Sequence, residues 1–259
     1  MGEHTGIEWT DSTWNPVTGC TRVSSGCDNC YAATLAEKRL RHVYLRTLPV
    51  VNTEDNRADA FAVRLWPERL DQPILWTDAR MIFVNSMSDL FHVDVPDEYV
   101  LAMFDVMFTA DWHIYQVLTK RPARAARFWE KHAHEFGGTE IPQHIWIGTS
   151  IENEDVAYRA RHLRRVRATI RFLSCEPLLG PLGDISLDGI HWVIGGGESG
   201  SAARPVDLSW AISLRDRCVR SNVPFFWKQW GGRTPKAGGR LLEGEEWNEY
   251  PRIGVRSAA

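Results

Sequence analysis

The chain has 259 residues, 44% of them hydrophobic, which is enough to bury the core of one large α/β domain or two small ones. A net charge of −3 gives no overall positive field for nucleic acid or acidic membranes, although a local basic groove is compatible with it. No apolar run has membrane-spanning length, and the first residues lack the apolar core of a signal peptide, so we expect a cytoplasmic protein that does not enter a membrane. In that compartment the five cysteines stay reduced, and clustered ones indicate metal ligands or catalytic thiols.

Short apolar runs alternate with longer helical or loop segments, and each run ends at polar or glycine residues. Buried parallel strands have this pattern. The runs are 14–19, 81–85, 114–118, 145–148, 170–173, 191–194 and 224–227. Helices are predicted at 97–108, 153–167 and 208–221 from acidic or capping residues at their starts, with Asp207 and Ser209 as the caps of the last. The arginines between 159 and 171 are expected on a solvated outer face.

Seven strand–helix units predict an α/β fold, namely a partial or complete (β/α) barrel of the TIM type formed by residues 1–259 as one domain. A doubly wound open sheet is the alternative. Residues 47–76 are expected to be an insertion after the first strand that covers the site. Residues 231–259 are expected to be an extension with a small hairpin around Glu243 and Gly244. In either fold, ligands bind beyond the carboxyl ends of the strands, where most of the reactive residues stand, so the pattern indicates an enzyme.

Three cysteines, Cys20, Cys27 and Cys30, follow the first strand in a C-x6-C-x2-C arrangement. Thiolates bind zinc, copper(I) and iron–sulfur clusters. Structural zinc uses four ligands, usually as two pairs, whereas three cysteines suit a [4Fe–4S] cluster with one iron left open for another ligand. The alternative is a zinc site completed by Cys175 or by a distant histidine.

This cluster resembles that of the radical S-adenosylmethionine (SAM) superfamily, in which a cysteine triad follows strand one of a β/α barrel. The fuller pattern looks like a phage-associated, poorly characterised family within or beside that superfamily, and is distantly similar to spore photoproduct lyase-like proteins. It consists of IEWTDSTWNPVTGC, GCDNCYA, NSMSDLFH, LTKRP, SCEPLLGP and WVIGGGESG, between Ile7 and about Trp230. The superfamily's usual spacing is C-x3-C-x2-C, and the aromatic residue that normally precedes its last cysteine is Asn29 here.

The resemblance implies an enzyme whose cluster reductively cleaves SAM to a 5′-deoxyadenosyl radical, which then abstracts hydrogen from a substrate. It also implies a one-electron reductant of the flavodoxin or ferredoxin type. The substrate is not apparent from the sequence, but the phage association favours a nucleobase, a nucleotide or a nucleic acid. Two alternatives remain: an iron–sulfur or zinc protein that acts on nucleic acid without radical chemistry, and a β/α enzyme with a structural metal.

Candidate cofactor-binding residues stand at the ends of three strands. By resemblance, Ser86 and Asp89 follow strand two, where the superfamily holds the methionine amino group, and Thr149, Ser150 and Asn153 follow strand four, where it holds the ribose. Helix capping is the alternative role for Asp89, Ser150 and Asn153.

A glycine run and a tyrosine complete this set. Gly195, Gly196 and Gly197 allow close backbone approach, and Glu198 can accept hydrogen bonds from an ammonium group or a ribose hydroxyl. The alternative for the run is a tight turn. Tyr31 is a candidate to stack on adenine, or else belongs to the core.

The remaining candidates concern substrate and catalysis. Lys120 and Arg121 place two cations at the barrel mouth for a carboxylate or phosphate, with a solvated pair as the alternative. Lys228 and Gln229 stand between two tryptophans and are expected to line a substrate pocket, unless those rings only pack the core. The candidate catalytic residues are Lys120, Cys175 and Glu176; the Cys175 thiol would donate hydrogen or bind metal, or else be buried and inert.

Overall fold

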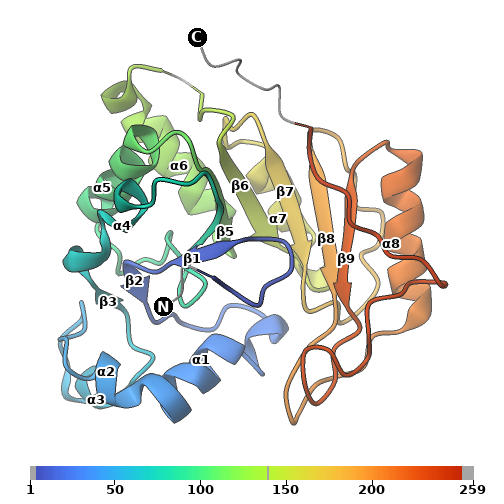
Figure 1. Cartoon of the computed structure of the whole chain (residues 1–259), viewed down its shortest axis with the longest axis horizontal. Helices are drawn as coiled ribbons and strands as arrows, with labels where there is room; N and C mark the ends of the chain where they lie inside the picture. The colour runs from blue at the N-terminus through green and yellow to red at the C-terminus, as the bar shows by residue number, and fades with distance from the viewer. Residues whose placement is uncertain (1–3, 139, 253–259) are drawn as a thin grey trace.

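The computed structural model describes residues 4–138 and 140–252, which form an α/β fold around one seven-stranded parallel sheet (Figure 1). The order of the strands in this sheet is the same as their order along the chain, and every pair of neighbouring strands is parallel. In spatial order the strands are β1 (Ser12–Trp14), β4 (Met81–Val84), β5 (Ile114–Thr119), β6 (Ile145–Ser150), β7 (Arg171–Cys175), β8 (Trp192–Gly196) and β9 (Phe225–Gln229).

This strand order distinguishes the two predicted architectures. A doubly wound sheet reverses its strand order at a switch point, whereas here the order never reverses, so that alternative is wrong. The sheet curls into a half-barrel, and no pairing within the described chain joins β1 to β9 (Figure 1). A partial barrel is therefore confirmed, and each of the seven predicted apolar runs contains or overlaps a strand.

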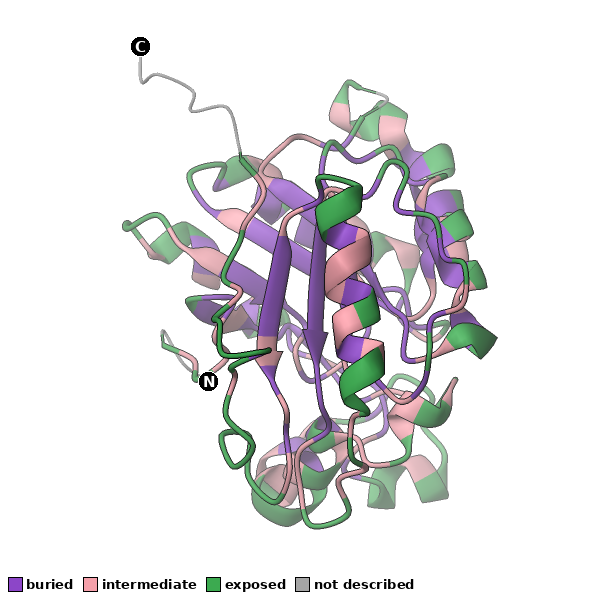
Figure 2. Cartoon of the chain, turned by 90° about the vertical axis from the view of Figure 1, so that its right-hand side faces the viewer, coloured by how far each residue is buried: buried purple, intermediate pink, exposed green. Residues whose placement is uncertain are grey.

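Four helices cover the convex face of the sheet: α5 (Asp97–Thr109), α6 (Pro122–His132), α7 (Tyr158–Leu163) and α8 (Leu208–Arg220). In Figure 2, α8 lies over β8 and β9 with its outer side exposed. Its buried residues Leu214 and Cys218 pack with Trp227 of β9 in the main core. The side chain of Asp207 accepts a hydrogen bond from the Ser209 N–H, which confirms Asp207 as the cap, whereas Ser209 lies within the helix. The helix predicted at 153–167 is shorter than expected, because a 3₁₀ turn, η5 (Glu154–Val156), precedes α7.

The concave face carries a second, aromatic core. Alternate strand residues such as Phe83, Trp146 and Trp192 point into it and pack against Trp9 from the N-terminal segment. Tyr250 from the other end of the chain packs on the same cluster. Both terminal segments therefore fill the inside of the half-barrel.

The C-terminal hairpin is only partly as predicted. Glu243 and Gly244 have φ angles of 54° and 86°, so the turn is where the sequence places it. The two arms, however, share only an isolated bridge, between Leu242 and Glu245. The second arm instead runs antiparallel to β9, where the Trp227 N–H donates to the carbonyl of Trp247 at 2.9 Å, because the edge of β9 leaves backbone groups that need partners.

Most of the remaining elements lie in the long connection between β1 and β4. The short strands β2 (Val17–Thr18) and β3 (Arg64–Leu65) pair antiparallel. The helical elements there are η1 (Ser25–Cys27), α1 (Tyr31–Leu35), the π-helical η2 (Ala36–Leu40), α2 (Arg41–Tyr44), α3 (Glu54–Ala58), η3 (Pro67–Arg69) and α4 (Gln72–Leu75); a further 3₁₀ turn, η4 (Ala133–Phe136), follows α6. Within residues 4–138 and 140–252, no helix combines the length and apolar character needed to cross a membrane.

Candidate metal and cofactor site

The three clustered cysteines lie on a loop at the carboxyl edge of the sheet. The loop starts at Gly19, which bridges to Ser88 beyond the end of β4. Gly19 has a φ of 86°, and a Cβ there would lie 2.2 Å from the Ala62 carbonyl oxygen, so the position requires glycine. The N–H of Cys20 donates to the Phe61 carbonyl at 3.0 Å. The insertion therefore packs against the start of the cysteine loop.

Cys20, Cys27 and Cys30 are free thiols of intermediate exposure. Cys27 and Cys30 line one surface cavity of about 290 Å³. The Cys20 sulfur instead lies 3.5 Å from Nη1 of Arg121. In the part of the chain that the structure describes, no group of three or more Cys, His, Asp or Glu side chains has the arrangement of a metal site. Burial and the nearby charge of Asp89 raise the pKa of Cys20 to about 11, although Arg121 acts in the opposite direction.

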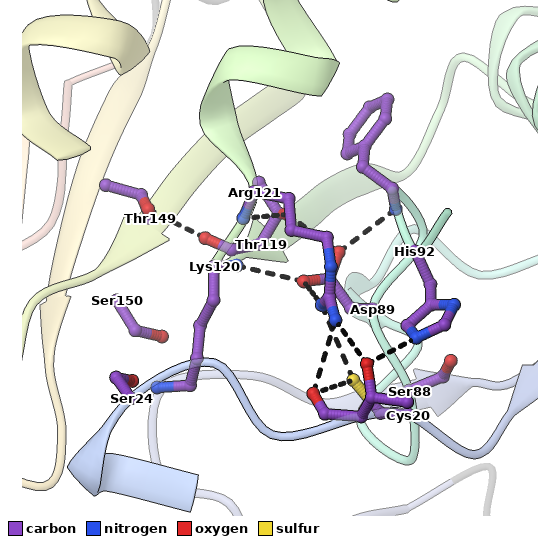
Figure 3. A network of polar contacts seen from close by, with 12 residues as sticks. Cys20, Ser24, Ser88, Asp89, His92, Thr119, Lys120, Arg121, Thr149 and Ser150 are labelled. Atoms are coloured by element: carbon purple, nitrogen blue, oxygen red, sulfur yellow. Dashed lines mark hydrogen bonds and ion pairs between the residues drawn. The ribbon is translucent and has the colours of Figure 1, made fainter. Parts of the chain in front are cut away.

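Asp89, beyond the end of β4, anchors the first part of this loop (Figure 3). The carboxylate is 4% exposed and accepts a hydrogen bond from Arg121 Nη1 at 2.8 Å. Its other donors are Thr119 Oγ1 at 2.6 Å and the N–H groups of Phe91 and Lys120, each at 3.0 Å. Asp89 therefore has no free acceptor for a cofactor ammonium group, contrary to the role that the resemblance implies.

Arg121 transmits this anchoring to the loop. Its Nη2 donates to the carbonyl and the hydroxyl of Thr21, at 3.2 and 3.0 Å. The same hydroxyl lies 2.8 Å from Nε2 of His92, a buried ring whose pKa is lowered chiefly by burial (Figure 3). Sequence reasoning missed His92, because a single histidine at the end of the NSMSDLFH segment carries no spacing signal.

Glu152, two residues beyond β6, is the second anchor. Its carboxylate is fully buried and accepts hydrogen bonds from Ser24 Oγ at 2.9 Å, from Arg159 Nη1 at 3.0 Å and from the ammonium of Lys120. Burial alone would raise the pKa of Glu152, but Lys120 and Arg159 outweigh it and hold the pKa below its usual value. Arg159 is thus buried in an ion pair, and its predicted place on a solvated face is wrong.

Glu198, two residues beyond β8, is the third anchor. It accepts hydrogen bonds from Arg204 Nη2 at 2.7 Å and from Asn29 Nδ2 at 2.9 Å, and Arg204 also donates to the Ser25 carbonyl at 2.9 Å. Although burial opposes ionisation, these contacts lower the pKa of Glu198. Asn29 therefore binds a buried carboxylate from within the cysteine loop.

The three anchoring carboxylates, Asp89, Glu152 and Glu198, therefore follow alternate strands of the half-barrel and hold successive parts of one cysteine loop. Over residues 4–251 the sequence matches the family described as "Protein of unknown function (DUF5131)". The chain belongs to this family. No curated protein and no solved structure gives a significant match.

In this DUF5131 protein, Tyr31 is the first residue of α1, and its side chain contacts the segment that follows β4. Its hydroxyl donates to the Ser86 carbonyl at 2.5 Å, and its ring is 53% exposed rather than part of the core. The Ser86 hydroxyl itself donates to Asn15 Oδ1 at 3.2 Å. Tyr31 is therefore available for stacking at the mouth, whereas Ser86 is engaged within the protein.

The candidates after β6 are mostly engaged in the fold. Thr149 is buried and donates to the Thr119 carbonyl at 2.7 Å, and the Ser150 carbonyl accepts from Arg159 at 3.0 Å. Asn153 stands at the N-cap position of η5 without a side-chain cap bond. Its Oδ1 is buried and has no hydrogen-bond partner among the described residues. Of these residues, Asn153 retains the clearest unused polar atom.

The glycine run is required mainly by packing. A Cβ on Gly195 would lie 2.9 Å from the Trp227 ring, and one on Gly197 would lie 2.0 Å from the Trp230 carbonyl oxygen. At Gly196 the nearest atom would be Oε1 of Glu176, at 3.3 Å. Gly196 is thus the member of the run next to the charged residues of the mouth.

Glu176 and Lys228 form an ion pair at the carboxyl ends of β7 and β9, with 3.0 Å between Oε1 and Nζ. Both side chains are partly exposed, so the pair is accessible to a substrate. The neighbouring Gln229 is buried and donates to Ser199 Oγ at 2.7 Å, which gives it a structural contact.

Cys175 does not belong to this mouth. Its side chain is fully buried in the core between the sheet and the convex helices, in the same cluster as Cys218, and burial raises the pKa of its thiol. The proposed roles of Cys175 as a metal ligand or hydrogen donor are therefore corrected to a core-packing role. Alternation along β7 turns this side chain to the helix side, which the motif SCEP alone does not reveal.

Proposed function

We propose that this protein is a radical SAM-type enzyme that binds a [4Fe–4S] cluster through Cys20, Cys27 and Cys30. The observation that carries the proposal is the position of all three cysteines on one anchored loop at the carboxyl edge of a parallel half-barrel. Ligands of such folds bind at that edge. The partial barrel of the structure agrees with a barrel of the radical SAM kind.

The residues present fit such a cluster in chemistry. Three thiolates suit an iron–sulfur cube, and the guanidinium of Arg121, 3.5 Å from the Cys20 sulfur, offsets part of their negative charge. The Cys20 sulfur contacts Arg121, and Cys27 and Cys30 share a cavity, so uptake would have to bring all three sulfurs onto one group. When bound and reduced, the cluster supplies the electron that cleaves SAM to a 5′-deoxyadenosyl radical.

The protein's own residues have three further roles: they anchor the cysteine loop, bind SAM and bind the substrate. The three anchoring carboxylates hold the loop in place rather than contact a cofactor. Tyr31 keeps an exposed ring, and Asn153 keeps an unpaired Oδ1, near the mouth for SAM. The Glu176–Lys228 pair offers a substrate one acceptor and one cation, which suits a polar, hydrogen-bonding substrate such as a nucleobase or nucleotide.

Anaerobic reconstitution tests the metal centre. Wild-type protein should become brown and hold about four irons per chain. Cys27→Ala should lose that iron, whereas Cys218→Ala, which removes a buried thiol of the core, should keep it. Colourless protein with a single zinc ion, or equal iron loss from both variants, would refute the ligand assignment.

The chemical step needs a second assay. Reconstituted protein mixed with dithionite and SAM should release 5′-deoxyadenosine, measured by chromatography. An intact cluster that yields none would refute the radical activity and favour an iron–sulfur protein that acts on nucleic acid without it.

A further inference from the structure

The long connection between β1 and β4 carries a run of exposed apolar side chains. Leu45, Leu48, Val50 and Val51 lie at the end of α2 and in the turn that leads to α3, and we call these four residues the apolar turn. All four are exposed, Leu48 by 64%. A single exposed aliphatic side chain is ordinary on a protein surface, but several along one short turn indicate a contact with another molecule.

The apolar turn has a fixed backbone. Arg64 of β3 is fully buried beneath it, and its Nε donates to the Thr47 carbonyl at 2.8 Å, while its Nη2 donates to the Asn56 carbonyl at 3.1 Å. The N–H of Val50 donates to the Val63 carbonyl at 2.8 Å. Because the turn is already ordered, little conformational entropy is lost when a partner binds it.

Basic residues precede the apolar turn. Lys38, Arg39 and Arg46 are exposed, and no ion pair within the described residues involves them; we call these three residues the basic face. The neighbouring Arg41 is instead neutralised by Glu37, at 2.6 Å. The basic face is therefore a local positive surface on a chain whose net charge is −3.

Acidic residues follow the apolar turn. Glu54 and Asp55, in the first turn of α3, are exposed and form no ion pair with any described residue; we call these two residues the acidic face. Arg57 is the one cation of α3. Nη2 of Arg41 donates to the Ala58 carbonyl at 2.8 Å, so α2 and α3 lie side by side (Figure 1). Basic face, apolar turn and acidic face therefore belong to one compact part of the surface.

A surface of this composition is complementary to itself. In a two-fold dimer the same surface of both copies meets, so the basic face of each copy can contact the acidic face of the other, with the two apolar turns between them. We infer that this surface binds a second copy of the chain, an inference that goes beyond the proposed function and does not rest on it. Four aliphatic side chains are few for an obligate dimer, so the association should be reversible, with a Kd on the order of micromolar.

The acidic face favours a protein partner over a nucleic acid. Tyr31, at the start of the same helical segment, has an exposed ring that could stack on a base, and the basic face could bind phosphates. Glu54 and Asp55, however, would repel a phosphate backbone that extended across the apolar turn to α3. A second copy satisfies the cations, the acids and the apolar side chains together.

Sedimentation velocity over a concentration series tests the inference, on protein with or without iron. Wild type should change from monomer to dimer as its concentration rises. Lys38→Glu with Arg39→Glu, and separately Glu54→Lys with Asp55→Lys, should each raise the dissociation constant by roughly tenfold or more at low salt. An equimolar mixture of these two variants should associate again, because every acidic position of one copy then meets a basic position of the other.

Matched controls separate the surface from general effects of charge and hydrophobicity. Arg127→Glu with Arg161→Glu makes the same change of net charge at exposed positions on α6 and α7 and should leave the dimer unchanged. Leu48→Glu should raise the dissociation constant by about tenfold or more, whereas Leu75→Glu, at a 75% exposed position on α4, should not.

Each other outcome has a defined meaning. Wild-type protein that stays monomeric at every concentration, or a dimer that all these variants leave intact, would overturn the inference while the proposed function stands. Charge variants that stay monomeric when mixed would overturn the pairing of basic with acidic faces. A monomer that binds a single-stranded DNA oligonucleotide, and loses that binding on Lys38→Glu with Arg39→Glu, would overturn the inference in favour of a nucleic-acid surface.

Discussion

Replacing Asp89 with asparagine tests whether the first anchoring carboxylate stabilises the cysteine loop. The native carboxylate accepts four hydrogen bonds, one of them from the Arg121 guanidinium. An asparagine amide keeps one acceptor oxygen and turns an NH₂ group toward existing donors. The change therefore removes about two hydrogen bonds and leaves Arg121 without its buried counter-charge.

The expected cost follows from these contacts. Hydrogen bonds to a charged group contribute about 1.5–3 kcal/mol each, and breaking a buried ion pair by removing one partner costs about 3–5 kcal/mol. These two figures describe the same contacts and are not added. Asp89→Asn should thus lower the free energy of unfolding by about 3–5 kcal/mol.

Urea denaturation, followed by the fluorescence of the 12 tryptophans, measures this loss. Asp105→Asn is the matched control, because Asp105 is exposed on α5 and its replacement should change stability by no more than about 0.5 kcal/mol. Trypsin should also cleave after Arg22 faster in Asp89→Asn under native conditions, since Arg121 no longer holds Thr21. A loss below about 1 kcal/mol with unchanged cleavage would refute the anchoring role.

Three further changes probe other parts of the structure. Glu198→Gln weakens the contact with Arg204, so hydrogen exchange in the loop at Ser25 should become faster; unchanged exchange would contradict the third anchor. Gly197→Ala should destabilise the protein by several kcal/mol, more than Gly196→Ala, because its Cβ would meet a backbone oxygen at 2.0 Å; equal urea midpoints would show that the loop adapts. The pKa of Asp97 is lowered to about 2, first by Lys131 and then by His132 and Arg124, so its carboxylate stabilises the fold above its unfolded pKa of about 3.8, and this contribution disappears as the pH falls toward 2. Asp97→Asn should therefore cost about 1–2 kcal/mol at pH 7 after allowance for solvent screening, and the difference from wild type should vanish as the pH falls below about 2; a constant difference across that range would argue against it.

Much of the fold could be predicted because it depends on local patterns. Apolar runs such as 145–148 are too short and too rich in β-branched and aromatic residues for helices, and their spacing suits parallel strands with crossovers. The cap at Asp207 and the turn at Glu243 follow from chemistry within a few residues. The path of the tail was not predictable, because only the assembled sheet shows that β9 is its edge strand.

The candidate site was also predictable only in part. The sequence places Cys20, Cys27 and Cys30 on one loop after the first strand, and the order of strands brings Lys120, Glu152 and Glu198 to the same edge. It gives no means of telling that Glu198 binds Arg204 and Asn29, or that Cys175 faces the helices. The contact between Glu198 and Asn29 and the orientation of Cys175 both depend on tertiary packing, which the local motifs do not specify.

The sequence by itself determined which residues are present at the carboxyl edge and that parallel strands would carry them there, because strand patterning and thiol spacing are local properties. Only the tertiary structure decided that the carboxylates hold the cysteine loop and that the Cys20 sulfur lies beside Arg121. The physical reason is that a buried charge must be neutralised by whichever cation the fold brings within hydrogen-bond distance, and that cation can come from another strand end, as Arg121 does for Asp89, 32 residues earlier in the chain.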